Sequence, residues 1–110
     1  MIQLGQTVFG LNLKAANAKL AIVKGVCMQQ TITATGRVHV VLRIKQNQPV
    51  EVYDSSLCFE TEDAAKDFYN ANSAAYKSID TDIINPAYKA ADEKRNAILG
   101  APLFPELADK

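Results

Sequence analysis

The sequence predicts an α+β domain: a small antiparallel β-barrel or strongly bent sheet (about residues 4–59), followed by two α-helices and an extended C-terminal tail. Twelve of the 16 Val and Ile residues lie in residues 1–60, whereas 11 of the 16 Ala residues lie in residues 61–110. Branched side chains favour strands and Ala favours helices. Charge divides similarly: residues 1–58 hold six basic and two acidic side chains, a net +4, and the remaining residues hold six basic and ten acidic ones, a net −4.

Three segments of the first half have the pattern of strands. The clearest is Val38–Lys45, in which apolar side chains at even positions alternate with mostly polar ones. The stretch Leu20–Thr33 is also rich in strand-forming residues, and its alternation slips around Gly25, which predicts a bulge or sharp bend there. A tight turn, with Gly36 free to adopt a positive φ, joins these segments into a hairpin. Gln6–Phe9 is expected to be an opening strand.

Two further segments complete the predicted sheet. A turn at Gln46–Pro49 leads into a short strand at Val50–Tyr53. Asp54–Ser56 breaks this strand, and Leu57–Phe59 is a short apolar segment. Several short strands leave exposed edges, and closure into a barrel removes such edges. The pattern therefore favours a closed barrel.

The second half begins with a predicted helix after Thr61. Thr61 is a suitable N-cap, and the two acidic residues that follow it lie where the helix dipole favours anions. Apolar side chains recur at helical spacing and predict one buried face. This face comprises Ala65, Phe68, Tyr69, Ala75, Tyr76 and Ile79.

A second helix is predicted to start at Asn85, the N-cap, and Pro86, the first helical residue. It is expected to run to Leu99, with Gly100 as the residue that follows its end. One narrow face of this helix consists mainly of small residues, namely Ala87, Ala90, Ala91 and Ile98. Residues 101–107 are apolar and contain two prolines, which predicts an extended tail.

Length and composition predict a single domain, with a β part over residues 1–60 and a helical part over residues 61–110. Twelve basic and 12 acidic side chains cancel, which argues against a strongly basic nucleic-acid coat. No apolar run approaches the roughly 18 residues of a membrane span. The first residues also lack the features of a secretory signal. The expected protein is therefore a cytoplasmic domain.

The order of segments resembles a known class of small barrels. Gly5–Phe9 is a glycine-bearing opening strand, Lys24–Val26 lies in a bent strand, and the run Phe59–Ala65 leads into a helix after two more strands. This order is similar to that of SH3-like barrels, including KOW-type ones, in accessory proteins of bacteria and phages. The similarity covers about residues 4–70. It implies a module that binds protein or nucleic acid and that rarely has catalytic activity.

No combination of residues predicts catalysis. The single histidine, His39, falls on the polar side of its strand, and Cys27 and Cys58 lie among apolar neighbours, where structural thiols are expected. A Cys–His pair and a disulfide are the alternatives, but cytoplasmic thiols are normally reduced. These three residues lack metal-ligand spacing. The acidic cluster Glu60–Asp67 is explained by the helix dipole. We expect no enzymatic activity, no metal and no cofactor.

One predicted binding surface is cationic. Because strand side chains alternate, the odd-numbered residues of the Val38–Lys45 segment should share one face. The expected members are Arg37, His39, Arg43 and Lys45, with Lys24 or Gln30 as extensions from the partner strand and Tyr53 as a stacking ring. A cationic sheet face can follow a phosphate backbone. The alternative is an ordinary solvated outer face.

A second predicted surface is the apolar tail, with Leu103, Phe104 and Leu107. The tail either docks on its own domain, which is the preferred interpretation, or binds a partner, including a second copy of the chain. A homodimer is therefore an alternative to a monomer.

Together these features predict a non-enzymatic protein-binding module. It would be a small accessory or inhibitor protein of the kind that phages and mobile elements carry, and it would act by covering a partner's surface. The uneven charge distribution would speed the encounter with a complementary partner. The alternative is a nucleic-acid-binding protein that uses Arg37, Arg43 and Lys45.

Overall fold

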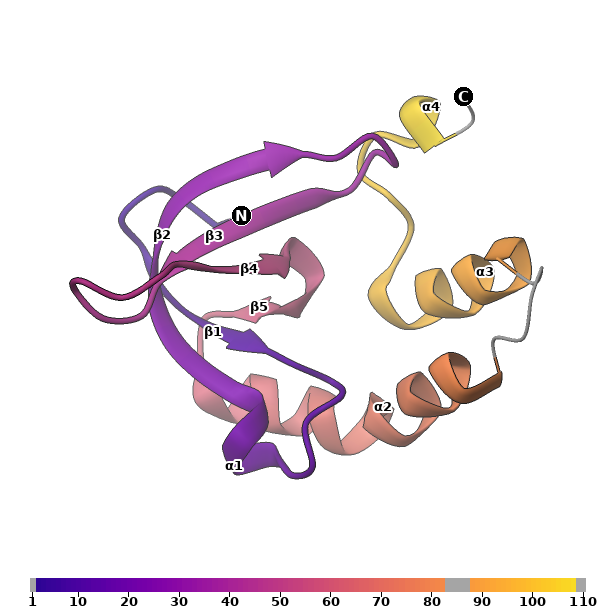
Figure 1. Ribbon diagram of the computed structural model, residues 1–110, viewed down its shortest axis with the longest axis horizontal. Coiled ribbons are helices and arrows are strands. Elements are labelled where there is room, and N and C mark those ends of the chain that lie inside the picture. Colours follow the sequence, from indigo (N-terminus) through magenta and orange to yellow (C-terminus); the bar gives the residue numbers. More distant parts are fainter. Residues whose placement is uncertain (1, 83–87, 109–110) are drawn as a thin grey trace.

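A computed structural model describes residues 2–82 and 88–108, in which the strands precede all helices except two short ones, α1 and η1 (Figure 1). One antiparallel sheet has the strand order β4-β3-β2-β1-β5. Its strands are β1 (Thr7–Leu11), β2 (Ile22–Ile32), β3 (Val38–Arg43), β4 (Glu51–Asp54) and β5 (Cys58–Phe59). The helices are α1 (Ala18–Ala21), the 3-10 helix η1 (Ser55–Leu57), α2 (Glu62–Asp82), α3 (Tyr88–Leu99) and α4 (Pro105–Ala108). The predicted α+β class is confirmed.

The sheet is bent but not closed into a barrel. Its edge strands, β4 and β5, follow one another in the chain, yet no backbone pairing joins them in the described part of the structure. Between them, the Asp54 carboxylate accepts a hydrogen bond from the N–H of Ser56 and starts η1. The chain therefore turns before an extended fifth strand forms, and β5 has only two residues. The predicted closed barrel is wrong, because this turn leaves both edges open.

The β2–β3 hairpin contains the expected irregularity. Its register shifts between Cys27 and Gln29, slightly beyond the predicted bulge at Gly25. Cross-strand partners share a face of a sheet, and Cys27 pairs with Leu42 whereas Ile32 pairs with Val38. In β2, the odd-numbered residues before the bulge and the even-numbered residues after it therefore lie on the same face, which is the inner face of the bent sheet.

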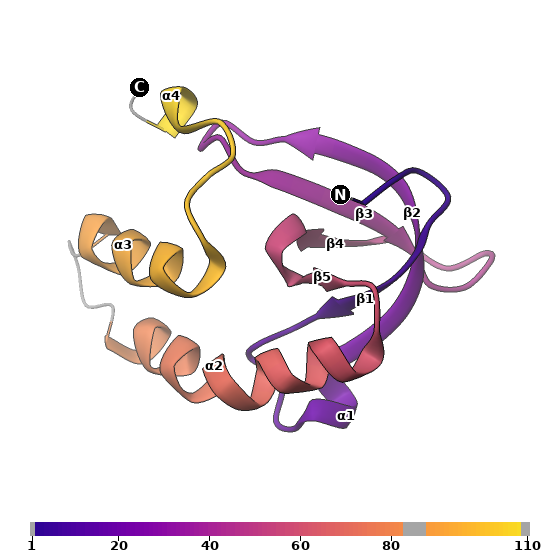
Figure 2. The same cartoon turned by 180° about the vertical axis from the view of Figure 1, so that it is seen from behind.

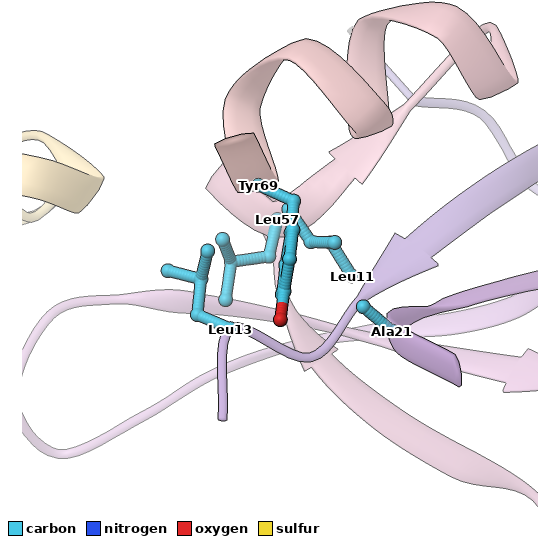
Figure 3. Close-up of a cluster of buried hydrophobic side chains, with 5 residues drawn as sticks. All are labelled: Leu11, Leu13, Ala21, Leu57 and Tyr69. Carbon is cyan, nitrogen blue, oxygen red and sulfur yellow. The ribbon is translucent and has the colours of Figure 1, made fainter. Parts of the chain in front are cut away.

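A first hydrophobic cluster connects the sheet to the helices (Figure 3). Its buried members are Leu11, Leu13, Ala21, Leu57 and Tyr69. The Tyr69 hydroxyl donates a hydrogen bond to the carbonyl of Ala15, which satisfies the polar end of this buried ring. Ile98 and Leu99 of α3 pack against the same cluster. The two long helices are therefore attached to the sheet through one core.

A second cluster fills the inner face of the bent sheet. Val8, Cys27, Val40 and Leu42 are each no more than 1% exposed. Gly10 is needed beside them, because a Cβ atom there would lie 2.8 Å from the Tyr53 ring. The close approach of Tyr53 to Gly10 brings β4 across the inner face toward β1.

The predicted start of α2 is confirmed, and its buried face is confirmed in part. Thr61 accepts a hydrogen bond from the N–H of Ala64 and caps the helix. Ala65, Tyr69 and Ile79 are buried, whereas Ala75 is exposed, contrary to the prediction. The second half of α2 lies against α3 rather than the sheet (Figure 1). The side chains buried in this half therefore differ from those that continue the face buried in the first half.

The end of α3 is also as predicted. Gly100 has a φ of 87°, and its N–H donates to the carbonyl of Asn96, as expected of a glycine after a helix end. The predicted start at Asn85 and Pro86 lies outside the described residues, as do Ala87 and the side chains of Ala90 and Ala91. In the described segments, no helix is long and apolar enough to cross a membrane.

The tail returns to the tip of the hairpin (Figures 1 and 2). The Phe104 N–H donates to the carbonyl of Gly36, 2.9 Å away, and Gly36 has a φ of 80° in the predicted turn. Docking on the same domain, the preferred interpretation, is therefore the arrangement observed. The prediction of a fully extended tail is wrong beyond Phe104, because α4 follows.

Candidate functional site

Arg37 belongs to a structural network rather than to an open basic face. Its Nε and Nη2 donate to the carboxylate of Asp54, and its Nη1 donates to Asn96 Oδ1 and to the Gly100 carbonyl, each at 3.0 Å. The side chains of Arg37 and Asp54 are only 15% and 11% exposed. These contacts tie the hairpin and β4 to the C-terminal end of α3. The expectation that Arg37 faces a ligand is therefore corrected: its donors are used within the fold.

The same network holds Asp54 in its charged form. Partial burial by itself would raise the pKa of the carboxyl group. Hydrogen bonds from Arg37 and from the hydroxyl and N–H of Ser56, together with the charge of Arg37, outweigh burial and hold the pKa below its ordinary value of 3.8. Asp54 is therefore a structural anion at neutral pH.

Two other residues of the predicted basic face have different outcomes. His39 lies on the outer face of β3, as predicted, where it is the cross-strand partner of Asp54, but it is half-buried. Tyr53 pairs with Val40, so it lies on the inner side, and its hydroxyl donates to Glu51. Burial, then the hydrogen bond and charge of Glu51, and finally the charge of Cys58 raise the Tyr53 pKa. Tyr53 is therefore not on the basic face.

The exposed part of the predicted basic face is Lys24, Arg43 and Lys45. Val26 pairs with Arg43, and Lys24 lies two residues from Val26 on the same outer side of β2. Gln30 pairs with Val40 and lies on the opposite, inner side. All three cations are exposed, and no carboxylate of residues 2–79 or 93–107 forms an ion pair with them. The outer face thus retains a smaller cationic patch.

A polar cleft of about 950 Å³ lies beside β4. Its walls come from the segment after β1, from the turn of the hairpin and the beginning of β3, from β4 and from α3. The charged and hydrogen-bonding residues around it include Lys14, His39, Asp54, Glu93, Arg95 and Asn96. Both signs of charge are present, and Arg37, Asp54 and Asn96 already bind one another. The cleft therefore has no net preference for an anion or a cation.

A second, apolar groove lies between the tail and the end of the β2–β3 hairpin, and we call it the tail groove. It has a volume of about 640 Å³, within the range of ligand pockets. It is lined by Ile2, Gln30, Thr31, Ile32, Val38, Ser55, Cys58, Glu60, Leu103 and Phe104. Ile2 and Cys58 also pack against the second hydrophobic cluster. The groove is therefore the open end of the inner face whose closed end is the core.

The tail groove exposes large apolar side chains. Leu103 is 66% exposed and Ile32 is 55% exposed, whereas Val38 and Phe104 are half-buried. Of the predicted tail residues, Leu103 and Phe104 form a wall of the groove, and Leu107 does not line it. Ile32 and Val38 were missed as binding residues, because their alternation also fits an ordinary core strand. No local feature of the sequence distinguishes them, because their exposure depends on which other segments cover this end of the hairpin.

The two thiols lie close to this groove but are poorly suited to nucleophilic chemistry. Cys27 is buried in the second cluster, and Cys58 borders the groove. Burial, the neighbouring Cys27 and the charge of Asp54 raise the pKa of Cys58 to about 12. Little thiolate is present at neutral pH, and the thiolate is the reactive form. No group of His, Cys, Asp and Glu among the described residues could hold a metal ion.

Comparison with known protein families, with curated proteins and with solved structures finds no match to this chain.

Proposed function

We propose that this chain is a non-enzymatic protein-binding module of the accessory or inhibitor type, and that it binds its partner through the tail groove. The observation that carries the proposal is the exposure of Ile32 and Leu103 around an apolar groove of about 640 Å³. Covering such side chains removes apolar surface from water, at roughly 25 cal/mol per Å². The groove therefore offers a partner a favourable contact.

The chemistry of the titratable groups also favours binding over catalysis. The charge of the Asp54 carboxylate is neutralised by Arg37, which also bonds to α3. The raised pKa of Cys58 keeps its thiol protonated. A general base next to an activated nucleophile is the usual requirement of covalent catalysis, and these two groups do not supply it.

The proposal is tested by affinity capture with three forms of the protein. The native chain, an Ile32→Lys variant and a Val50→Lys variant are immobilised and exposed to a lysate of cells that naturally contain the protein. Ile32 and Val50 are 55% and 51% exposed, but only Ile32 lines the groove. Val50→Lys is therefore a matched control for charge and exposure.

The expected result is a protein that the native chain and Val50→Lys retain and that Ile32→Lys does not. The captured protein, once purified, should bind the three forms in the same order in calorimetry. A set of captured proteins that is identical for all three forms, or no capture by any form, would contradict the proposal.

A second candidate function is nucleic-acid binding, which the exposed patch of Lys24, Arg43 and Lys45 favours. Three phosphate contacts would make log affinity fall with log salt at a slope of about −2 to −3. Fluorescence anisotropy with short single- and double-stranded DNA and RNA measures this slope. Neutralising all three side chains should flatten it, and an unchanged slope would exclude the patch as the site.

A further inference from the structure

The free edge of β2 lies directly beside the tail groove. The N–H of Thr33 donates to the carbonyl of Arg37, so these residues form a hydrogen-bonded pair of the β2–β3 ladder. In an antiparallel ladder such pairs alternate with pairs that are not hydrogen-bonded. Thr31 therefore points its backbone groups at β3, whereas Gln30 and Ile32 point theirs to the opposite edge.

No neighbouring strand satisfies this part of the edge. β1 pairs with β2 only from Ile22 to Val26, and beyond it Gly5 and Gln6 bond to Cys27. The segment nearest to Gln30 is the N-terminal one: the Gln30 side-chain amide donates to the carbonyl of Ile2, 2.6 Å away, and this contact does not use the backbone of Gln30. Within the described residues, the backbone groups of Gln30 and Ile32 have no backbone partner on that side.

A strand added at this edge would direct alternate side chains into the tail groove. Residues opposite Gln30 and Ile32 would share their inner face, because cross-strand neighbours lie on the same side. Both Gln30 and Ile32 line the groove. The space is short, since Cys27 is already bonded to Gly5 at one end and the hairpin turns at Gly36 at the other. A segment of about four or five residues fits this length, at roughly 3.3 Å per residue.

The groove also has a preference for charge. Among the described residues, Glu60 is the only charged one that lines the groove; it is exposed, and no basic side chain among them forms an ion pair with it. A basic residue on the bound segment would complement this carboxylate. An acidic one would be repelled by it.

From these observations we infer that the partner contributes an extended segment with alternating apolar residues and one basic residue, which pairs as an additional strand with Gln30 and Ile32 of β2. Such strand addition combines backbone hydrogen bonds with side-chain pockets. The inference rests on the proposed function, because it specifies what occupies the tail groove.

The probe for this inference is a library of capped six-residue peptides with valine, isoleucine or leucine at alternate positions and lysine or glutamate at one end. Binding to the ¹⁵N-labelled full chain is followed by amide chemical shifts and by hydrogen exchange. We expect the lysine peptides to bind more tightly than the glutamate peptides. We also expect the amides of Gln30 and Ile32 to become protected in the complex.

Methylation of single backbone nitrogens in the best peptide supplies the decisive control. Methylating an amide that faces β2 should weaken binding about tenfold, since it removes one hydrogen bond and leaves a carbonyl of β2 without a donor. Methylating the amides between these positions should have little effect. The Val50→Lys protein should bind like the native chain, and Ile32→Lys should not bind.

Three outcomes would overturn the inference. If binding depends on Ile32 but responds to methylation without a two-residue period, the groove takes an apolar ligand by another mode, and the proposed function stands without strand addition. If no peptide binds at millimolar concentration, an extended segment is not the occupant. If Gln30 and Ile32 are protected without peptide and in proportion to protein concentration, the edge pairs with a second copy of the chain.

Discussion

The inner face of the β2–β3 hairpin has a closed end and an open end, which differ in burial although they belong to the same two strands. At the closed end, Val40 and Leu42 are fully buried. At the open end, Val38 is half-buried and Ile32 is 55% exposed. These four apolar side chains lie on one face, as their strand register requires.

The covering elements explain this difference. β1 brings Val8 over the closed end, and β4 brings the Tyr53 ring close to it. At the open end the cover consists of Ile2 and the tail, and the tail is attached through one backbone hydrogen bond to Gly36 and through the Arg37 network. Alternation therefore makes a face available for burial, and another part of the chain decides whether it becomes core or binding surface.

The largest expected difference between the two ends is in stability. Leu42→Ala should lower the free energy of unfolding by about 2–5 kcal/mol, because it leaves a cavity in a packed region. Ile32→Ala should change it by only about 0.5–1 kcal/mol, because the side chain is mostly in water. Urea denaturation measures both values. Equal losses would show that the open end is as well packed as the closed end.

The next largest effect concerns the network that holds the helices near the open end. Arg37→Met should destabilise the fold by roughly 2 kcal/mol, since Asp54 loses charged hydrogen bonds and the Gly100 carbonyl loses a donor. Arg43→Met, at an exposed residue at the end of β3, is the control and should lie within about 0.5 kcal/mol of the native chain. Similar values for both variants in urea denaturation would contradict the structural role of Arg37.

A smaller effect tests the attachment of the tail. Gly36→Ala and Gly5→Ala replace glycines with φ of 80° and 82°, so both variants should lose about 1–2 kcal/mol from backbone strain. Only at Gly36 would the new Cβ also collide with the backbone of Phe104. Hydrogen exchange at the Phe104 amide should therefore accelerate in Gly36→Ala alone. Unchanged protection in both variants would mean that this contact does not hold the tail.

The smallest expected effect is a difference in acid sensitivity. The pKa of Asp54 is lower in the fold than its ordinary value of 3.8, so its contribution to stability is fully present above pH 4 and is lost as pH falls through the lower, folded pKa. Asp54→Asn cannot lose this contribution. Its stability should therefore decline less between pH 5 and pH 2, as measured by urea denaturation across that range. Parallel pH profiles would show that Asp54 is not stabilised as an anion.

Features that depend on neighbouring residues were predicted well. The hairpin with its turn at Gly36, the cap at Thr61 and the helix end at Gly100 are all found where expected. Each follows from a local preference: strand alternation, a side chain that accepts from an amide three residues on, or a glycine that tolerates positive φ.

The candidate site was predicted only in part. Leu103 and Phe104 stand out in the sequence because they are apolar and close to prolines, and they do form a wall of the groove. Ile32 and Val38 have the pattern of core residues, and only the absence of β1 beside them makes them part of a binding surface. Arg37 has the pattern of a surface cation, yet Asp54 and α3 enclose it.

The sequence by itself determined the division into a β half and a helical half, the main turns and the caps, because these depend on backbone preferences within a few residues. Only the tertiary structure decided that the sheet stays open, that Arg37 is internal and that the end of the hairpin carries a groove. These features depend on contacts such as those of Arg37 with Asp54, Asn96 and Gly100. Contacts between distant segments form only when burial and hydrogen bonding outweigh the entropy of bringing those segments together, and no local pattern records that balance.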